Sequence, residues 1–388
     1  MQTVAKPLVA VTGGRGLPPS WGGVERQWEA VYTRLAGSGW NILVYARATY
    51  VPPGTTSHQG VAVKVLPTVK STFLEAFVHT FLAVLHMAFV SRPAIVHVYS
   101  QGPCLMLPLV KLLMPGAKVF FTCGGVDWQR RKWPLLAAWI IRLGGYFSAR
   151  LTDCRIMVSQ ELVRHYRDMY GVESVCIPNG VDIPAPAPAD PLAAMELASG
   201  QYFLSVGRIT PEKRVEDIIA AFRSGPRRVK LAVVGDDAAG SGYMQGLRAL
   251  AEGDERIVFT GYRYTEDLAA LFGNALAFIT SSELEGMPLT LLEAMSHGRA
   301  CLASAIAPHY EVLGRDAPWI FPTLDRAALA ALMDQAEAVG PEGMSAYGLE
   351  CRARVASRFG WDLAVDKMKT LYGQALAGKP CRLEEPSE

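Results

Sequence analysis

Two glutamates, Glu285 and Glu293, frame a segment whose residue types suit the binding of a phosphate and a sugar. Pro288 suits the first turn of a helix and Gly298 its end, so the spacing predicts a helix that begins within Gly286–Leu289. Free backbone N–H groups and the positive end of the helix dipole would attract a phosphate there. Glu285 could accept hydrogen bonds from sugar hydroxyls, and Glu293, roughly one and a half turns into the helix, could reach a ribose. The alternative is an amphipathic helix with two solvated glutamates.

A second segment, Gly207-Arg208-Ile-Thr-Pro-Glu-Lys213, follows the strand-like run 202–206. Pro211 marks the start of a helix, so Arg208 and Lys213 are expected to project from the loop at the end of the strand. Two fixed cations in such a loop match a diphosphate leaving group, whose charge they would stabilise as a sugar–phosphate bond breaks. Salt bridging at the surface is the alternative interpretation.

Glycines form a third candidate site near the N-terminus. Gly22 and Gly23 open a helix after the loop 13–19, and they would let a phosphate approach the backbone closely. A glycine-rich loop after the first strand is also found in dinucleotide-binding folds. The spacing here, however, is not the G-x-G-x-x-G of those folds.

Three further candidates follow strands of the first half: His97, Tyr99 and Asp127. Asp127 is the only carboxylate between Glu75 and Asp153, which makes it a candidate polar group near a reacting centre; its alternative role is a helix N-cap. The alternative for His97 is a core histidine whose ring nitrogens are hydrogen-bonded.

Two apolar stretches raise the question of a membrane. The residues 73–90 contain Glu75, His79 and His86, so a spanning helix is not expected, and burial is the default. The basic cluster 130–132 runs into the Trp-rich segment 133–141, the pattern of an interfacial helix on an anionic membrane. A core helix with a solvated end is the alternative.

The elements that must position these residues alternate regularly. Short β-branched runs, separated by longer helical patterns, occur at 8–11, 42–45, 61–66, 95–98, 118–121, 155–158 and 175–177, and again at 202–206, 230–234, 257–259, 277–279 and 300–303. This alternation predicts two doubly wound parallel sheets, each covered by helices on both faces. Ligands of such sheets bind at the carboxyl ends of the strands, so the candidate loops are expected to face a cleft between two domains.

The proline-rich stretch 184–191 separates the two series and predicts an interdomain linker. We expect a first domain at 1–182, a second at 183–357, a final helix within 358–378 and a disordered tail at 379–388.

Composition sets further limits. The 388 residues carry a net charge of +2, but residues up to 180 hold 18 Lys and Arg against 8 Asp and Glu, whereas the remainder holds 20 against 28. A basic first half favours an anionic surface as its partner, and a charge bias that aids docking of the two halves is the alternative. The seven cysteines are scattered, without a C-x-x-C pair, which argues against a zinc site or a disulfide framework. Residues 1–6 do not form a signal peptide, so a cytoplasmic location is expected.

Taken together, these residues resemble the GT4 family of retaining glycosyltransferases over most of the chain. The resemblance is carried by four motifs in order: Gly22-Gly23-x-Glu25, Ile177-Pro-Asn-Gly-Val-Asp182, Gly207-Arg208 with Glu212-Lys213, and Glu285 to Glu293. It implies the GT-B fold, two Rossmann-like domains facing across a cleft, with the final helix crossing back onto the first domain. It also implies metal-independent transfer without a cofactor, in agreement with the lack of a D-x-D motif in a suitable loop.

The resemblance implies a role for each motif residue. Arg208 and Lys213 would grip the donor diphosphate, Glu293 would hold the ribose, and Gly22 and Gly23 would close over the phosphates. Glu285 would hold the transferred sugar together with the backbone of the residues Gly286, Met287, Pro288 and Leu289. Asp127, Arg208, Lys213 and Glu285 are the catalytic candidates, and His97, Tyr99 and Asp127 form the acceptor side.

The N-terminal motif is similar to that of a bacterial subgroup often assigned to rhamnosyl or related transfer onto surface polysaccharides. Two departures stand out: Tyr99 and Gly124 occupy positions where that subgroup usually has histidines. They indicate that the acceptor or the handling of the proton differs, or that transfer is weakened.

The sequence thus predicts hexosyl transfer from a nucleotide-sugar donor to a hydroxyl of a glycan or lipid-linked glycan. The expected location is the cytoplasm, with peripheral contact to the inner face of an anionic membrane through the basic first domain. No nucleic-acid partner is expected. The rival hypotheses are a sugar-nucleotide epimerase or hydrolase on the same architecture, a sugar-nucleotide binding protein without turnover, and a nicotinamide oxidoreductase, which the missing dinucleotide fingerprint disfavours.

Overall fold

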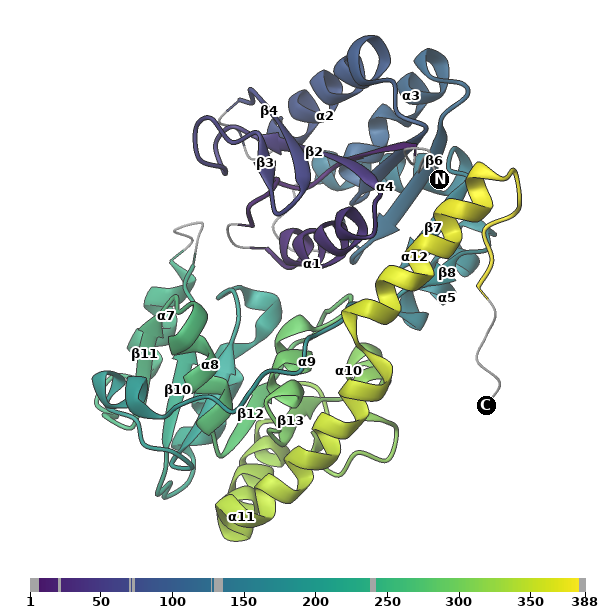
Figure 1. The fold of residues 1–388 in the computed structure, drawn as a ribbon. Helices are drawn as coiled ribbons and strands as arrows, with labels where there is room; N and C mark the ends of the chain where they lie inside the picture. The colour runs from purple at the N-terminus through teal and green to yellow at the C-terminus, as the bar shows by residue number, and fades with distance from the viewer. Residues whose placement is uncertain are drawn as a thin grey trace. The chain divides into compact units, whose positions relative to one another are not determined.

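The computed structural model describes residues 7–19, 22–69, 71, 74–126, 128, 135–237 and 242–383. The chain divides into two compact units. One unit runs to Gly180 and resumes at Trp361, and the other spans Val181–Gly360 (Figure 1). The first boundary predicted from the sequence, after residue 182, lies two residues later than the observed one, and the second, after residue 357, lies three residues earlier.

The first unit is built on an eight-stranded sheet in the order β3-β4-β2-β1-β5-β6-β7-β8, parallel except for the pair β3–β4. Its elements are β1 (Leu8–Thr12), α1 (Gly23–Gly37), β2 (Asn41–Arg47), β3 (Ser57–His58), β4 (Val61–Leu66), α2 (Glu75–His86), the π-helical turn η1 (Met87–Ser91), β5 (Ile95–Tyr99), the 3-10 helix η2 (Gly102–Met106), α3 (Leu107–Leu113), β6 (Lys118–Cys123), α4 (Leu135–Arg150), β7 (Cys154–Met157), α5 (Gln160–Tyr170), β8 (Val175–Cys176) and α12 (Trp361–Leu376).

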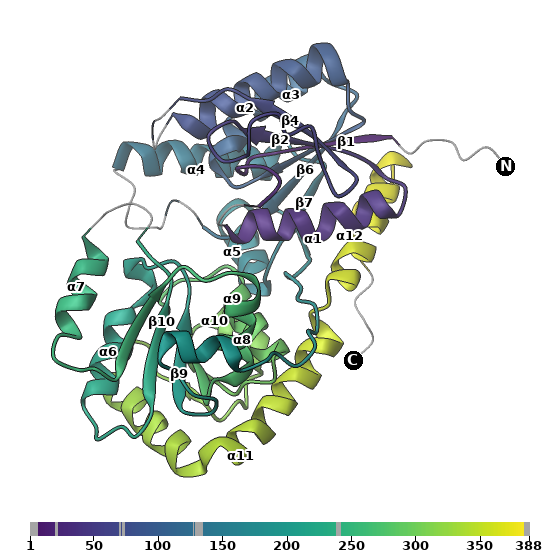
Figure 2. The same cartoon turned by 60° about the vertical axis from the view of Figure 1, so that its left-hand side comes forward.

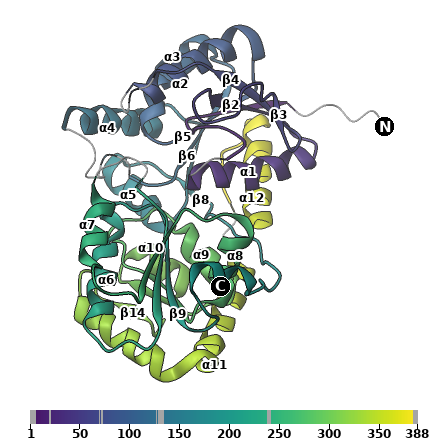
Figure 3. The ribbon, with the colours of Figure 1, turned by 90° about the vertical axis from the view of Figure 1, so that its left-hand side faces the viewer.

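The connections of the first sheet determine which helices cover which face. The chain moves one way along the sheet from β1 to β2 and the opposite way from β4 to β5, β6, β7 and β8. Right-handed crossovers therefore place α1 on one face and α2 to α5 on the other. The final helix, α12, lies beside α1 (Figure 3). With both faces covered, β1 is a continuous apolar strand in which Val9, Ala10 and Val11 are fully buried.

The second unit holds a six-stranded parallel sheet in the order β11-β10-β9-β12-β13-β14. Its elements are η4 (Asp190–Met195), β9 (Tyr202–Val206), η5 (Pro211–Lys213), α6 (Val215–Arg223), β10 (Lys230–Val234), α7 (Tyr243–Leu250), β11 (Ile257–Gly261), α8 (Thr265–Asn274), β12 (Ala277–Thr280), α9 (Leu289–Ser296), β13 (Cys301–Ser304), α10 (Ala307–Leu313), β14 (Ile320–Phe321) and α11 (Arg326–Arg358), which kinks at Gly340–Pro341. One apolar core, which includes Phe203, Phe222 and Leu302, fills the space between this sheet and its helices. The predicted fold class, two parallel doubly wound sheets, is thus confirmed.

Two segments differ from the expectation. The proline-rich stretch is packed onto the second unit: the carbonyl oxygen of Pro184 accepts a hydrogen bond from Arg352 at 2.8 Å, and that of Pro188 accepts one from Asn274 at 3.3 Å. Proline keeps its carbonyl as an acceptor, so such a segment can be fixed without being a helix or strand. The predicted disordered tail is held at Arg382, whose backbone makes two hydrogen bonds to the side chain of Gln374. Residues 384–388 lie outside the described residues.

Within the described ranges, no helix combines the length and the apolar character needed to cross a bilayer.

Candidate functional site

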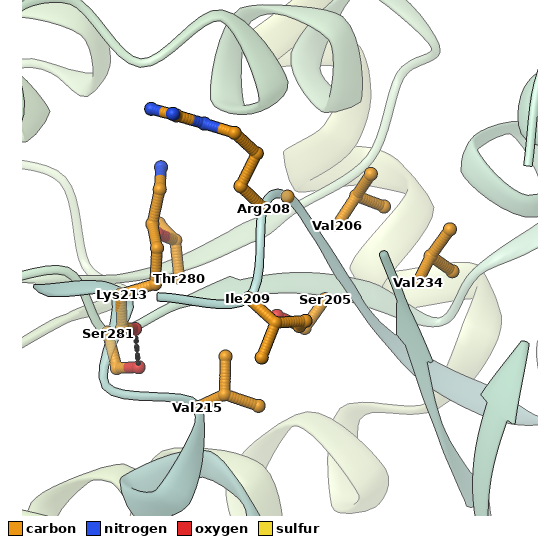
Figure 4. Close-up of a pocket in the computed structure, with 10 residues that line it drawn as sticks. Ser205, Val206, Arg208, Ile209, Lys213, Val215, Val234, Thr280 and Ser281 are labelled. Atoms are coloured by element: carbon orange, nitrogen blue, oxygen red, sulfur yellow. Dashed lines mark hydrogen bonds between the residues drawn. The ribbon is translucent and has the colours of Figure 1, made fainter. Parts of the chain in front are cut away.

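A pocket open to solvent lies at the carboxyl end of β9, with about 270 Å³ of empty space when its open mouth is included (Figure 4). The order of the second sheet reverses between β9 and β12, and such a reversal is where open α/β sheets bind their ligands. The residues that line the pocket come from the ends of β9, β10 and β12, from the loop after β9 and from the start of α6: Ser205, Val206, Gly207, Arg208, Ile209, Lys213, Val215, Val234, Thr280 and Ser281. The sequence-predicted cations Arg208 and Lys213 therefore border the same pocket.

The loop that carries both cations is fixed by its backbone. Gly207 donates to the carbonyl of Val234 at 3.0 Å, and Ile209 donates to that of Asp236 at 3.1 Å, so Arg208 is held between two anchored residues. Figure 4 shows the side chains of Arg208 and Lys213 extending in the same direction, away from the apolar side chains of Ile209 and Val215. Two positive charges are thus presented together at the pocket.

A second loop, 281–288 after β12, is tied to the first. The Ser281 hydroxyl lies 2.9 Å from the carbonyl oxygen of Lys213 and 2.7 Å from that of Arg214. The backbone N–H of Glu283 donates to the carbonyl of Glu212 at 2.9 Å. These bonds join the two loops that carry separate candidate motifs in the sequence, although the two loops are about 70 residues apart along the chain.

Lys213 and Glu285 form an ion pair across the two loops. The Glu285 side chain is 13% exposed and also accepts a hydrogen bond from the Ser282 hydroxyl at 2.8 Å. Burial opposes ionisation of Glu285, but the charge of Lys213 and the hydrogen bonds to the carboxylate outweigh it, so the pKa of Glu285 lies below its ordinary value. A lysine ammonium has three donors, so Lys213 can hold Glu285 and still donate to a second anion.

The direction of this shift predicts a pH dependence. Because the pKa of Glu285 is lower in the folded chain than in the unfolded chain, its stabilisation is fully present above about pH 4.3 and is lost as the pH falls through the folded value. We expect Glu285→Gln to destabilise the protein more at about pH 7 than at about pH 3.5. Urea unfolding of the wild type and the variant at the two pH values measures their free energies of unfolding. A difference between the two proteins that is equal at both pH values would contradict the prediction.

The sequence reasoning missed His309, which lies behind Glu285 on α10. Its side chain is fully buried, and Nδ1 lies 2.8 Å from the carbonyl oxygen of Ser304. Burial lowers the pKa of His309 to about 4, so the ring is neutral at neutral pH. Ser304 in turn donates to the carbonyl of Ser282 at 2.7 Å. The polar support of the Glu285 loop thus extends to β13. The sequence did offer a sign of this role, because His309 is the third residue of a helix that follows strand β13.

A pair of tyrosines after β11 was also missed. The rings of Tyr262 and Tyr264 stack at 6.2 Å with an angle of 20°, and Tyr264 is half exposed. The Tyr262 hydroxyl donates to the carbonyl of Asp236 at 3.1 Å, in the loop that also anchors Ile209. This aromatic pair therefore lies at the same edge of the sheet as the pocket. Two aromatics after a strand, in Tyr262-Arg-Tyr264, were the signal.

Helix α9 begins at Leu289, later than most of the predicted range, and Pro288 is its N-cap in extended conformation. Gly286 and Met287 belong to the loop. Pro288 lies just outside the first turn because its ψ of 94° is not helical, although its carbonyl accepts the first helical bonds, from Leu291 and Leu292. No side chain caps this end of the helix.

The rest of the Glu285–Glu293 motif is not part of the pocket lining. In the described part of the chain, the segment 286–289 adjoins the pocket through Glu285 but does not line it. Glu293 lies on α9 and is half-buried. Gly298, with φ +71°, follows the end of α9, as the sequence predicted.

In the first unit, Gly22 is the N-cap of α1 and Gly23 its first residue. A Cβ at Gly22 would lie 1.8 Å from a carboxylate oxygen of Glu25, whose other oxygen accepts a hydrogen bond from the backbone of Arg15 at 2.8 Å. The need for glycine at position 22 is therefore explained by the buried Glu25, which holds the loop after β1. Gly23 is exposed. Both glycines stay predictions as donor-binding residues.

His97 and Tyr99 are part of the core of the first unit. His97 is fully buried; its Nδ1 lies 3.0 Å from the hydroxyl of Tyr32 and 2.6 Å from that of Tyr372, and its Nε2 lies 2.8 Å from that of Thr122. Burial lowers the pKa of His97 to about 3. Tyr99 is 1% exposed and accepts a hydrogen bond from Tyr32 at 3.0 Å. His97 is thus a core histidine with both ring nitrogens hydrogen-bonded, which was the alternative interpretation from the sequence. Because both rings are buried, direct contact of His97 or Tyr99 with an acceptor is disfavoured. Asp127 lies outside the described residues.

Among the residues that the structure describes, no group of three or more His, Cys, Asp or Glu side chains is placed to hold a metal ion. The positive charge of the described pocket comes from Arg208 and Lys213. The arrangement can bind an anion at the cations and hydroxyl groups at the Glu285 carboxylate.

Known proteins share this architecture. The chain is similar to sucrose-phosphate synthase from Thermosynechococcus elongatus, with a TM-score of 0.84 and 21% identity over 96% of this chain and 100% of that one. It is also similar to the Anabaena protein Alr3699/HepE in complex with UDP and glucose, with a TM-score of 0.79 and 14% identity over 96% and 100% of the two chains. These similarities establish the fold.

A curated relative is the lipopolysaccharide 1,6-galactosyltransferase of Salmonella typhimurium, 31% identical over 106 residues, which are 26% of this chain and 29% of that protein. The chain matches less than a third of the length of the curated relatives.

Two family models match successive parts of the chain: "Glycosyltransferase Family 4" over residues 21–184 and "Glycosyl transferases group 1" over residues 197–344. The first match covers most of the first unit and the second contains the pocket, the Lys213–Glu285 pair and α9. From these two matches and the fold shared with the solved structures, the chain belongs to the family 4 glycosyltransferases of the GT-B fold.

Proposed function

We propose that this protein transfers a hexosyl group, with retention of configuration, from a nucleoside-diphosphate sugar to a hydroxyl of a glycan or lipid-linked glycan of the bacterial surface. One observation carries the proposal: Arg208 and Lys213 border one pocket at the sheet reversal, and the Lys213–Glu285 ion pair joins that pocket to the loop before α9. A diphosphate needs fixed cations, and the sugar attached to it needs a group beside those cations that accepts hydrogen bonds from the sugar hydroxyls.

The first step of the chemistry is the loss of the diphosphate. The bond between the anomeric carbon of the sugar and the phosphate oxygen breaks, and negative charge grows on the leaving diphosphate. Arg208 and Lys213 would stabilise that charge, and the start of α9 would add its free N–H groups and dipole. The acceptor hydroxyl attacks from the face that the diphosphate leaves, and its proton passes to the leaving phosphate oxygen.

The sugar and the ribose would be bound by the second loop and α9. Glu285, ionised and fixed by Lys213 and Ser282, can accept hydrogen bonds from sugar hydroxyls. Glu293 on α9 would hold the ribose. The backbone of Gly286, Met287, Pro288 and Leu289 would contact the transferred sugar.

The proposed donor class is supported by the names of the relatives. One relative is named a galactosyltransferase, and one structure of this fold holds UDP and glucose. We therefore propose a hexose donor and place UDP-glucose and UDP-galactose first in the test. A rhamnosyl donor is the further candidate, on the resemblance of the N-terminal motif.

The acceptor would be bound by the first unit. Gly22 and Gly23 would close over the donor phosphates, and Asp127 is the candidate that would contact the acceptor hydroxyl. Since His97 and Tyr99 are buried among Tyr32, Thr122 and Tyr372, we propose that they act by positioning the strand ends rather than by touching the acceptor.

Thermal-shift screening against UDP-, GDP-, ADP- and dTDP-sugars tests the donor, and mass spectrometry of reactions with lipid-linked glycan acceptors tests transfer. We expect one donor class to raise the melting temperature and to label an acceptor. Consumption of donor without acceptor would instead identify an epimerase or hydrolase, and binding without turnover would identify a sugar-nucleotide binding protein.

We further propose that transfer needs no metal, because Arg208 and Lys213 supply the charge that a divalent cation supplies in other sites. Turnover with EDTA is expected to equal turnover with added Mg²⁺ or Mn²⁺. A loss of activity on chelation that Mn²⁺ restores would contradict this proposal.

A further inference from the structure

Helix α4 packs onto the first unit through its smallest residues. Gly144 and Gly145 are buried, and a Cβ at Gly144 would lie 2.1 Å from the carbonyl oxygen of Gln101. A Cβ at Gly145 would lie 2.6 Å from the hydroxyl of Tyr170. Ser148 and Ala149 continue this face one turn later. Apart from Ile141, the inward face of α4 therefore consists of small residues that allow close approach of backbones.

The opposite face of α4 carries the large apolar side chains. Six of them are exposed, with exposed fractions of 90% for Leu135, 75% for Leu136, 72% for Trp139, 44% for Ile140, 40% for Leu143 and 49% for Tyr146. At about 100° per residue, these six positions cover one arc of the helix, opposite Gly144 and Gly145. A helix at the surface of a water-soluble domain normally turns such a face inward. The reversed polarity of α4 indicates an apolar environment outside the domain.

Neighbouring helices also carry exposed apolar side chains. Helices α2, α3 and α4 cover the same face of the first sheet (Figure 2), and both α2 and α4 contact η2. Phe77 and Phe81 of α2 are 45% and 39% exposed, and Leu112 of α3 is 75% exposed. A concentration of large exposed apolar side chains on one helical layer marks an interaction surface.

The charges around α4 identify the partner. Helix α4 contains no Asp or Glu, but it carries Arg142 and Arg150, and three basic residues stand at 130–132 in the sequence just before it. The guanidinium of Arg142 lies 5.6 Å from the ring centre of Trp128, and that of Arg150 lies 5.9 Å from the ring centre of Tyr146. Cations beside an apolar helix face suit the headgroup region of an anionic bilayer. There the apolar side chains enter the boundary between headgroups and acyl chains, and the cations contact lipid phosphates.

We infer that α4 is an interfacial helix, which binds the first unit to an anionic lipid bilayer through Leu135, Leu136, Trp139, Ile140 and Leu143. A second copy of this chain is a poorer partner, because it would bring a second basic face against the first. Asp127, the candidate of the acceptor side, precedes the first residue of α4 by eight positions in the sequence. If the proposed function is right, binding of α4 would bring the acceptor side of the enzyme to the membrane surface, where a lipid-linked acceptor resides.

Vesicle flotation of the full-length protein tests this inference without donor or acceptor. We expect co-flotation with vesicles of phosphatidylcholine and phosphatidylglycerol, weak binding to phosphatidylcholine alone, and reduced binding at high salt. The double variant Leu136→Glu/Trp139→Glu should lower the partition coefficient at least about tenfold, because it places two carboxylates in the interfacial face. Both side chains are exposed, so the melting temperature should stay near that of the wild type.

The matched control is Leu349→Glu, at a 62% exposed leucine on α11 of the second unit, which should leave flotation unchanged. Failure of the wild-type protein to float with anionic vesicles, or flotation of the double variant equal to wild type, would overturn the inference. A concentration-dependent dimer in light scattering, dissociated by the double variant, would identify a second copy as the partner and overturn it too. Donor binding to the second unit is measured separately, without lipid, so failure here leaves the proposed function standing.

Discussion

Lys213→Ala is expected to lower turnover by about 10²–10³-fold, the size of effect seen when one donor to a developing oxyanion is removed. Lys213 borders the pocket and pairs with Glu285, so the substitution removes a charge from the proposed leaving diphosphate and also unpairs the carboxylate meant to hold the sugar. Initial rates at saturating donor measure the effect.

A matched control separates this effect from a general loss of charge. Lys230 lies on the same sheet and is paired with Glu196 at 3.8 Å, so Lys230→Ala removes an equal charge away from the pocket. We expect its turnover to stay within a factor of about two of wild type. Wild-type turnover in Lys213→Ala, with the fold intact by circular dichroism, would remove Lys213 from the catalytic candidates.

Gly235→Ala should destabilise the second unit by about 2–3 kcal/mol and weaken donor binding with it. Gly235 has φ +134°, and a Cβ there would lie 1.9 Å from the carbonyl oxygen of Gly207. That carbonyl directly precedes Arg208, so the new methyl group must push the cationic loop away from β10. Urea unfolding and calorimetric titration with the donor measure the two effects.

Gly253→Ala is the control for the backbone strain alone. Gly253 also has a positive φ, +78°, but a Cβ there would have no neighbour within 4 Å. We expect a cost of about 1 kcal/mol and unchanged donor affinity. Equal effects of the two substitutions would show that the contact between Gly235 and Gly207 does not position the site.

The central elements were predictable because strands such as β5 and β12 are buried along their whole length. A strand such as 230–234 must then be apolar throughout, and such runs are visible without any tertiary information. Strands β3 and β14 were missed, because Ser57–His58 is polar and Ile320–Phe321 lies between Pro318 and Pro322, so neither forms a recognisable apolar run. The packing of the proline-rich stretch was not predictable, because it depends on Arg352 and Asn274, which lie far along the chain.

The site was predictable in part. Arg208 and Lys213 follow a clear strand, so their presence in one strand-end loop could be inferred from order alone. The bonds that join this loop to Glu285 could not, because they run from a serine hydroxyl to main-chain carbonyls, and any serine can make such bonds. The hydrogen bond of His97 could not be inferred either, because its partner Tyr372 lies 275 residues away on the final helix.

The central claim is that Arg208 and Lys213 bind the diphosphate of the donor. Isothermal titration of wild type and of the Arg208→Ala/Lys213→Ala double variant, each with a nucleoside diphosphate and with the matching nucleoside, tests it most directly. The account predicts that the double variant loses most of the affinity for the diphosphate and retains that for the nucleoside. Equal affinity of both proteins for the diphosphate would contradict it.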